Sequence, residues 1–294
     1  MEFAGGLLLL LAAAGAVWAL AGSSRVLYPV RLSLPGLPSD YGLPFEPLSL
    51  KASDGVSISG WLLRRPSASG LLLLLHGFGS SKTEWLDLAR DLYKTGKFSL
   101  LLIDFRGHGQ SGPGPVSFGC REVLDVQAAL DYAAGDPALR ELPVGCWGIS
   151  MGGAIAIQAA SKSASIRAVV ADSSYSDTGK AIARAQWVTY YIPRFPLGQF
   201  VIWAVERRLK CRLADLDPVN KIAWIAPRPV FLIHGGKDAS VPSWHGSQLY
   251  RAAGEPKTWW LVPEAEHATC YYDRAEEYVK KITEFFQNVF LRTA

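Results

Sequence analysis

Three residues of different types could together form an activated serine nucleophile. Ser150 lies between two glycines in GISMG, Asp238 lies in HGGKDASVP, and His267 lies in EAEHA. A serine hydroxyl near its normal pKa is a poor nucleophile, and an imidazole oriented by a carboxylate can take its proton. The three residue types therefore predict acyl transfer, provided that the fold brings them together.

The pattern Gly-x-Ser-x-Gly is short enough to occur by chance, so the surrounding elements decide its meaning. Short apolar runs alternate with amphipathic helical stretches, and these runs are GLLLLLHG (70–77), FSLLLIDF (98–105), PVGCWGIS (143–150), IRAVVADSS (166–174), PVFLIHGG (229–236) and KTWWLVPEA (257–265). This alternation is typical of an α/β fold with a parallel sheet covered by helices on both faces. LSLKAS and VSISGWLL, on either side of Asp54-Gly55, predict a β-hairpin at the edge of the sheet.

Ser150, Asp238 and His267 each follow one of these predicted strands. Ligands of such sheets bind beyond the carboxyl ends of the strands, so we expect the three residues at one edge of the sheet. There Ser150 would act as nucleophile, His267 as base, and Asp238 as the acid that orients the imidazole.

The oxyanion of the transition state needs fixed hydrogen-bond donors near the nucleophile. The backbone amide of Met151, at the start of the helix after Ser150, is one candidate. The amide of Phe78, after the turn in HGFG (76–79), is the second. Gly148 and Gly152 are expected to relieve crowding around a sharp strand-to-helix turn.

Several residues compete for these roles or have simpler explanations. Asp172 is the alternative acid, because it follows the strand before the one that leads to Asp238. Asp104 is expected to brace its own loop through Arg106. The other histidines are interpreted as a turn residue (His76), a residue of a glycine loop at the rim of the site (His108), a buried strand residue (His234) and a residue at the entrance (His245).

Composition and the remaining motifs exclude several classes of function. The net charge is only +4, without a concentrated basic face, so no nucleic-acid partner is expected. Gly107, Gly109 and Gly112 spell a dinucleotide-binding pattern, but Pro113 prevents the helix that this pattern requires. The run GFGSSKT lacks the glycine before lysine of a phosphate-binding loop, and no Cys-x-x-Cys or HExxH is present. No cofactor and no metal are therefore predicted.

Two segments outside this pattern have their own predictions. Residues 175–226 are helical and rich in aromatic residues, and we expect them to form a cap that gives the site an apolar wall, with ordinary core-covering aromatics as the alternative. Residues 3–22 carry no charge and are long enough to cross a bilayer as a helix. A single-pass membrane anchor is favoured over a signal peptide cleaved after Ala19-Leu20-Ala21, which would leave a secreted or periplasmic protein.

HGFG, DFRGHGQSG, GISMGG, HGGKDASVP and EAEHA, in the chain order serine, acid, histidine, resemble the α/β-hydrolase superfamily. The resemblance runs from about residue 48 to the end of the chain. With the apolar N-terminal segment, the chain is similar to membrane-anchored, serine-aminopeptidase-like members. The resemblance implies an α/β-hydrolase fold with a mostly parallel sheet, to which residues 175–226 would add the helical cap, and it places the family's catalytic and oxyanion residues at Ser150, Asp238, His267, Met151 and Phe78.

These expectations divide the chain into residues 1–24 (anchor or signal segment), 25–47 (proline-rich linker) and 48–294 (hydrolase domain). The expected function is a serine hydrolase that cleaves a carboxylic ester or thioester with an apolar acyl group through an acyl-enzyme. The alternatives are an aminopeptidase or amidase of the same fold and a non-catalytic, membrane-tethered binding protein. The expected partners are a small hydrophobic acyl substrate and the membrane.

Overall fold

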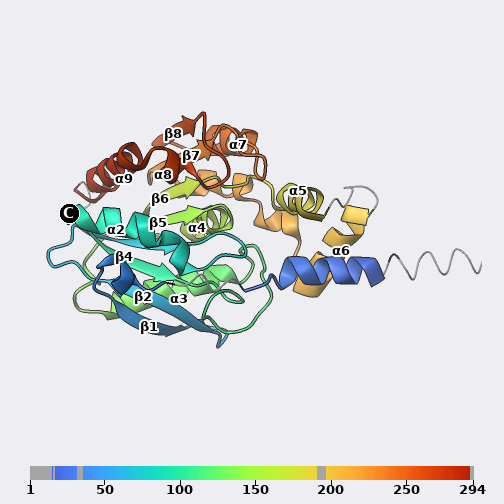
Figure 1. Ribbon diagram of the computed structural model, residues 1–294, viewed down its shortest axis with the longest axis horizontal. Helices are drawn as coiled ribbons and strands as arrows, with labels where there is room; N and C mark the ends of the chain where they lie inside the picture. Colours follow the sequence, from blue (N-terminus) through green and yellow to red (C-terminus); the bar gives the residue numbers. More distant parts are fainter. Residues whose placement is uncertain (1–14, 16, 32–35, 191–196, 292–294) are drawn as a thin grey trace, which may run out of the picture.

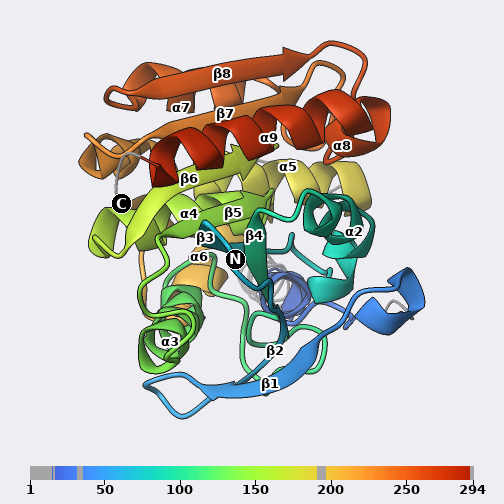
Figure 2. The same ribbon diagram turned by 90° about the vertical axis from the view of Figure 1, so that its left-hand side faces the viewer.

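One sheet organises the part of the chain that the structure describes. The computed structural model describes residues 15, 17–31, 36–190 and 197–291. Within these ranges eight strands pair in the order β1-β2-β4-β3-β5-β6-β7-β8. Figure 2 shows them stacked from β8 at the top to β1 at the bottom. The strands are β1 (Glu46–Lys51), β2 (Ser57–Leu63), β3 (Gly70–Leu75), β4 (Phe98–Ile103), β5 (Val144–Ile149), β6 (Ile166–Asp172), β7 (Val230–Gly235) and β8 (Lys257–Val262).

The pairing directions follow the predicted pattern. β1 pairs with β2 and β2 pairs with β4 in antiparallel register, which places the predicted hairpin at one edge. From β4 to β8 every neighbouring pair is parallel. The central strands β3, β4 and β5 are buried along their whole length, as continuous apolar runs require when helices cover both faces of a sheet. The predicted α/β-hydrolase fold is therefore confirmed.

Helices cover both faces of the sheet and make two apolar cores. One core joins the sheet to α3 (Glu122–Gly135), α4 (Met151–Lys162) and α7 (Trp244–Ala252). The other joins it to α2 (Leu86–Lys94), α8 (Cys270–Asp273) and α9 (Ala275–Phe290). Since parallel strands run in one direction, their carboxyl ends all open toward the same edge.

The interval between β6 and β7 is helical. It contains α5 (Thr178–Tyr190), α6 (Gln199–Leu209) and three 3-10 helices, η4 (Leu213–Leu216), η5 (Pro218–Asn220) and η6 (Ile222–Ile225). Figure 1 shows α5 and α6 beside the sheet, on the side opposite the C-terminus.

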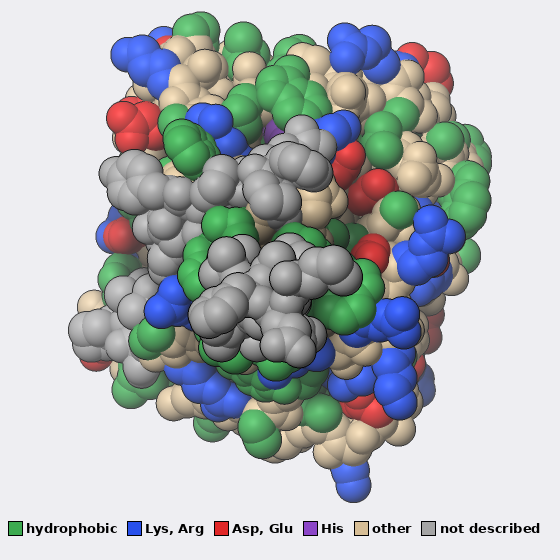
Figure 3. Space-filling view, turned by 90° about the vertical axis from the view of Figure 1, so that its right-hand side faces the viewer, with side chains coloured by type: hydrophobic (Ala, Val, Ile, Leu, Met, Phe, Trp, Pro, Cys, Tyr) green, Lys and Arg blue, Asp and Glu red, His purple; other side chains and the backbone are tan. Residues whose placement is uncertain are grey.

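Several aromatic side chains of this interval lie at the surface. Trp187, Phe200, Trp203 and Trp224 are between 46% and 66% exposed. On the face that carries this region, apolar side chains lie among lysines and arginines (Figure 3). Residues 191–196, which include two of the aromatics predicted for the cap, lie outside the described residues.

A helix formed by residues 17–27 packs against α6. An added Cβ at Gly22 would come within 2.7 Å of Val201 Cγ2, so the Val201 side chain packs directly against the glycine. Arg208 Nη1 donates to the hydroxyls of Ser23 at 3.0 Å and Ser24 at 2.7 Å. The N-terminal helix is thus joined to the helical interval by both packing and hydrogen bonds.

The predicted membrane anchor falls largely on residues outside the described ranges, namely 1–14 and 16. Among the residues that are described, no helix combines the length and the apolar character needed to span a bilayer.

The predicted proline-rich linker contains regular structure. Residues Pro38–Tyr41 form the 3-10 helix η1, and β1 begins at Glu46, inside the predicted linker range. Proline suits the first position of a helix because its missing N–H would have no partner there. Asp40 accepts the amide of Leu37 at 2.8 Å and closes the turn.

Candidate active site

Ser150 lies on a strained turn between β5 and α4. Its backbone has φ 53° and ψ −115°, an unusual conformation for a residue with a side chain. Its amide donates to the carbonyl of Asp172 at the end of β6, at 2.8 Å. Such strain persists only where the surrounding structure enforces it, and it lifts the serine hydroxyl above the end of the sheet.

The two glycines that flank the serine are required by close backbone approach. A Cβ on Gly148 would lie 2.1 Å from the carbonyl carbon of Gly152. A Cβ on Gly152 would lie 2.0 Å from the carbonyl oxygen of Leu75. Both contacts are with backbone atoms, which cannot rotate away as a side chain can.

We expect Gly152→Ala to lower the free energy of unfolding by at least about 2–3 kcal/mol, because overpacking a closed site forces the backbone to shift. Urea denaturation followed by circular dichroism would measure the loss. Gly135→Ala is the matched control, since nothing lies within 4 Å of its added Cβ at the end of α3. Equal unfolding free energies for the two variants would contradict the crowding argument.

Ser150, His267 and Asp238 form one hydrogen-bonded chain. His267 Nε2 lies 3.0 Å from Ser150 Oγ, and His267 Nδ1 lies 2.7 Å from Asp238 Oδ2. A carboxylate only accepts, so Nδ1 carries the proton and Nε2 is free to accept from the serine hydroxyl. The Asp238 carboxylate is buried and also accepts the amide of Val241 at 2.7 Å, which fixes its direction.

Asp172 is engaged elsewhere. Its carboxylate accepts the Tyr278 hydroxyl at 2.6 Å and the Ser173 hydroxyl at 2.9 Å. Burial raises the pKa of this carboxyl. Between the two candidate acids, the geometry therefore favours Asp238 as the partner of His267.

The two predicted oxyanion donors each adjoin a residue at the nucleophile: Met151 follows Ser150, and Phe78 follows Gly77, whose added Cβ would lie 3.6 Å from Ser150 Cβ. Met151 begins α4 directly after Ser150, and Phe78 lies in the loop that follows β3. Within the described ranges, neither amide donates to a protein acceptor outside regular structure. Unpaired N–H groups at a helix start can receive a negatively charged oxygen.

The other histidines are buried and structural. His76 donates from Nδ1 to the Gly77 carbonyl and accepts the Phe105 amide at Nε2, and burial lowers its pKa to about 3. His234 is buried in β7, as predicted. His108 and His245 are also buried, 0% and 1% exposed; His108 accepts an amide of the loop after β3, and His245 lines the space between α5 and the start of α7. Hydrogen bonds within the protein occupy both ring nitrogens of His108 and the Nδ1 of His245, which lies 2.8 Å from the Ser176 hydroxyl.

The expected role of Asp104 also needs correction. Its carboxylate pairs with Lys82 Nζ at 2.5 Å and accepts the Gln110 amide at 2.8 Å, so it braces the loop without Arg106. Arg106 instead pairs with Asp125 at 2.6 Å and with Asp54. These partners come from other elements, and an arginine buried among apolar residues needs such partners.

Glu84 is a residue of this region that no sequence motif identifies. It lies in the 3-10 helix η2 (Lys82–Trp85), and its Oε2 accepts the amide of Gly77 at 2.8 Å. It lines a cavity of about 350 Å³ beside the nucleophile, together with the chain neighbours of Ser150 and His267. In the sequence, the only indication of this role is that Glu84 is an acidic residue five positions after the HGFG motif.

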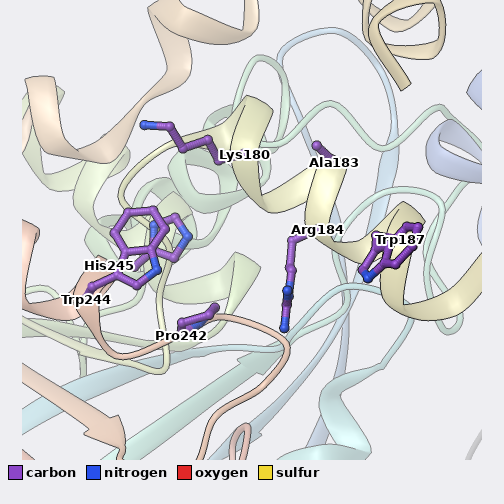
Figure 4. Close-up of a pocket in the computed structure, with 7 residues that line it drawn as sticks. All are labelled: Lys180, Ala183, Arg184, Trp187, Pro242, Trp244 and His245. Atoms are coloured by element: carbon purple, nitrogen blue, oxygen red, sulfur yellow. The ribbon is translucent and has the colours of Figure 1, made fainter. Parts of the chain in front are cut away.

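A second cavity, of about 300 Å³, lies between α5 and the start of α7 (Figure 4). It borders the loop that carries the proposed acid, since Arg184 Nε donates to the carbonyl of Ala239 at 3.0 Å. The rings of Trp244 and His245 stack with centroids 3.6 Å apart at its floor. Trp187 adds an aromatic side, so the cavity combines apolar walls with cationic side chains from α5.

The residues that the structure describes contain no group of three or more His, Cys, Asp or Glu side chains that could hold a metal ion.

Comparison with known proteins places these features in a family. A model described as "Alpha/beta hydrolase family" matches residues 72–281. The uncharacterized protein YfhR of Escherichia coli K12 is 26% identical over 251 residues, covering 82% of this chain and 80% of YfhR. Protein bem46 of Schizosaccharomyces pombe is 25% identical over 224 residues, covering 75% of this chain and 69% of bem46.

Solved structures show the same fold. The Pyrococcus furiosus esterase Pf2001 superposes with a TM-score of 0.75 at 23% identity, covering 90% of this chain and 98% of the esterase. An esterase from Exiguobacterium antarcticum superposes with a TM-score of 0.61 at 14% identity, covering 82% of this chain and 100% of that chain.

Proposed function

The chain belongs to the alpha/beta hydrolase family, and on that premise we propose that it is a serine hydrolase that cleaves carboxylic esters or thioesters. The observation that carries the proposal is the hydrogen-bonded chain from Ser150 through His267 to Asp238, with contacts of 3.0 and 2.7 Å. Two esterases of known structure share this fold, and this likeness supports the proposal.

In the proposed reaction, Ser150 Oγ attacks the carbonyl carbon of the ester while His267 Nε2 takes the hydroxyl proton. The resulting oxyanion accepts hydrogen bonds from the amides of Phe78 and Met151. His267 then gives the proton to the leaving oxygen or sulfur, and an acyl-enzyme remains. Water, deprotonated by the same imidazole, hydrolyses this intermediate and restores the serine. Asp238 keeps the imidazole in the required tautomer and stabilises its charged form.

The proposed substrate has an apolar acyl group. The half-exposed aromatic side chains of α5 and α6, and the aromatic walls of the cavity below α5, support this choice. Apolar binding sites with a few placed polar groups are typical of small-molecule enzymes.

A panel of p-nitrophenyl esters with increasing acyl length tests the proposal. We expect turnover of at least one ester, together with covalent labelling by a fluorophosphonate probe, because both need an activated serine. No turnover across the panel and no labelling would instead indicate a non-catalytic binding protein.

We also propose that residues 3–22 attach the protein to a membrane. The support is the uncharged, apolar sequence of this segment. Membrane fractionation combined with N-terminal sequencing distinguishes a retained anchor from a cleaved signal peptide.

A further inference from the structure

We propose that Glu84 and His108 are positioning residues that hold the loop of residues 76–79 so that the Phe78 amide faces the oxyanion. This inference rests on the proposed function, because it concerns the geometry of the same reaction. It assigns a task to a carboxyl and an imidazole that do not touch the reacting atoms.

The first contact is on the N-terminal side of Phe78. Glu84 Oε2 accepts the amide of Gly77 at 2.8 Å. Gly77 lies directly against the nucleophile, since a Cβ added to it would be 3.6 Å from Ser150 Cβ and 3.8 Å from each Glu84 carboxylate oxygen. The carboxyl of Glu84 therefore fixes the backbone at the point where the loop passes the serine.

The second contact is on the C-terminal side. His108 Nε2 accepts the amide of Gly79 at 3.1 Å, and its Nδ1 donates to the carbonyl of Arg106 at 3.1 Å. This arrangement requires a neutral ring with its proton on Nδ1. Burial lowers the pKa of His108, which keeps Nε2 available as an acceptor.

The amide between these two remains unused. Of the three consecutive N–H groups at residues 77–79, the outer two are held by side chains, and the Phe78 amide has no protein acceptor within the described ranges. The Phe78 ring stacks on Phe118, with centroids 5.8 Å apart and planes 13° from parallel. Both the backbone and the side chain of Phe78 are thus held while its donor stays open.

The Ser80 side chain and the His267 imidazole also act on the Glu84 carboxyl, and both favour its ionised form. In the ranges that the structure describes Glu84 forms no ion pair, and burial raises the pKa of its carboxyl. Partial burial of a carboxyl without a cation is costly, and the hydrogen bond from the Gly77 amide offsets part of this cost. Catalysis benefits because donors that are already fixed need no reorganisation when the oxyanion forms.

Glu84→Ala should lower kcat for a p-nitrophenyl ester by about 30- to 300-fold and change KM by less than about 3-fold, because a donor misplaced by about 1 Å loses transition-state stabilisation. Glu84→Gln keeps an oxygen that can accept from Gly77 and should restore kcat to within about 5-fold of wild type. His108→Phe removes the second acceptor, and we expect it to lower kcat in the same way.

Affinity for a trifluoromethyl ketone, which forms an oxyanion on the serine, separates positioning from loss of fold. It should weaken in Glu84→Ala by about the same factor as kcat/KM, since such analogues report transition-state binding. Asp87→Ala is the matched control: Asp87 lies three residues away, borders the same cavity as Glu84, and pairs with Arg90 at 3.1 Å instead of with the loop. Its kcat should stay within about 2-fold of wild type, as expected for an exposed ion pair.

Unchanged kcat and unchanged ketone affinity in Glu84→Ala would overturn the inference, as would Glu84→Gln being as impaired as Glu84→Ala. Fluorophosphonate labelling of the wild type checks the proposed function separately. Amide hydrogen exchange of residues 76–81 reports the contact even in a protein without turnover. Faster exchange in Glu84→Ala than in Asp87→Ala is expected, and equal exchange would contradict the contact.

Discussion

Replacing Ser150 with alanine should lower kcat/KM for the preferred p-nitrophenyl ester by about 10⁴- to 10⁶-fold, because the nucleophile and its base act as a unit. The hydroxyl lies 3.0 Å from His267 Nε2, on a backbone conformation that few residues with side chains adopt. Alanine has nothing that can form an acyl-enzyme. Steady-state kinetics and fluorophosphonate labelling followed on a gel measure both consequences.

Ser174→Ala is the matched control for this prediction. Ser174 is buried near the end of β6, and its hydroxyl has no hydrogen-bond partner in the described part of the chain. This variant should keep both labelling and turnover. Labelling that survives in Ser150→Ala would show that another residue is the nucleophile.

The second large effect is expected at Asp238. Asp238→Asn should lower kcat by about 10⁴-fold, because an amide group beside Nδ1 favours the wrong imidazole tautomer. The carboxylate is buried and lies 2.7 Å from His267 Nδ1, so no solvent group can take its place. Kinetics at saturating ester isolate the effect on kcat.

Asp172→Asn distinguishes the two candidate acids. The amide oxygen of the asparagine can still accept from one of the two hydroxyls, Tyr278 or Ser173, and its NH2 group can donate to the other, so we expect kcat to fall by less than about 10-fold. An equal loss of kcat in Asp238→Asn and Asp172→Asn would mean that the hydrogen bond from His267 to Asp238 does not identify the catalytic acid.

Much of the fold could be predicted because its central strands are buried on both faces. A strand such as β3, with six consecutive buried residues, has a continuous apolar sequence that stands out from the helices around it. Once the strands were located, the carboxyl-end rule predicted that Ser150, Asp238 and His267 would lie together. That prediction depends more on the position of the three residues at the ends of strands than on the Gly-x-Ser-x-Gly pattern.

The errors concern contacts between elements that sequence does not bring together. Asp104 and Arg106 are close in the chain, yet their buried partners are Lys82 and Asp125, on other elements. Hydrophobic periodicity predicts which face of a helix is buried. It does not predict which charged side chain of a neighbouring element will pair with a residue on that face. The contact from Glu84 to Gly77 was missed for the same reason, because it depends on how η2 folds back over the loop after β3.

The contact between the helix of residues 17–27 and α6 has a practical consequence for protein production. Removing the apolar N-terminus to improve yield is a natural choice, and a truncation at residue 28 would also remove Gly22, Ser23 and Ser24. Val201 would then meet water, and Arg208 would lose two acceptors. A shortened chain that begins before residue 17 keeps this contact intact and is the better starting point for purification.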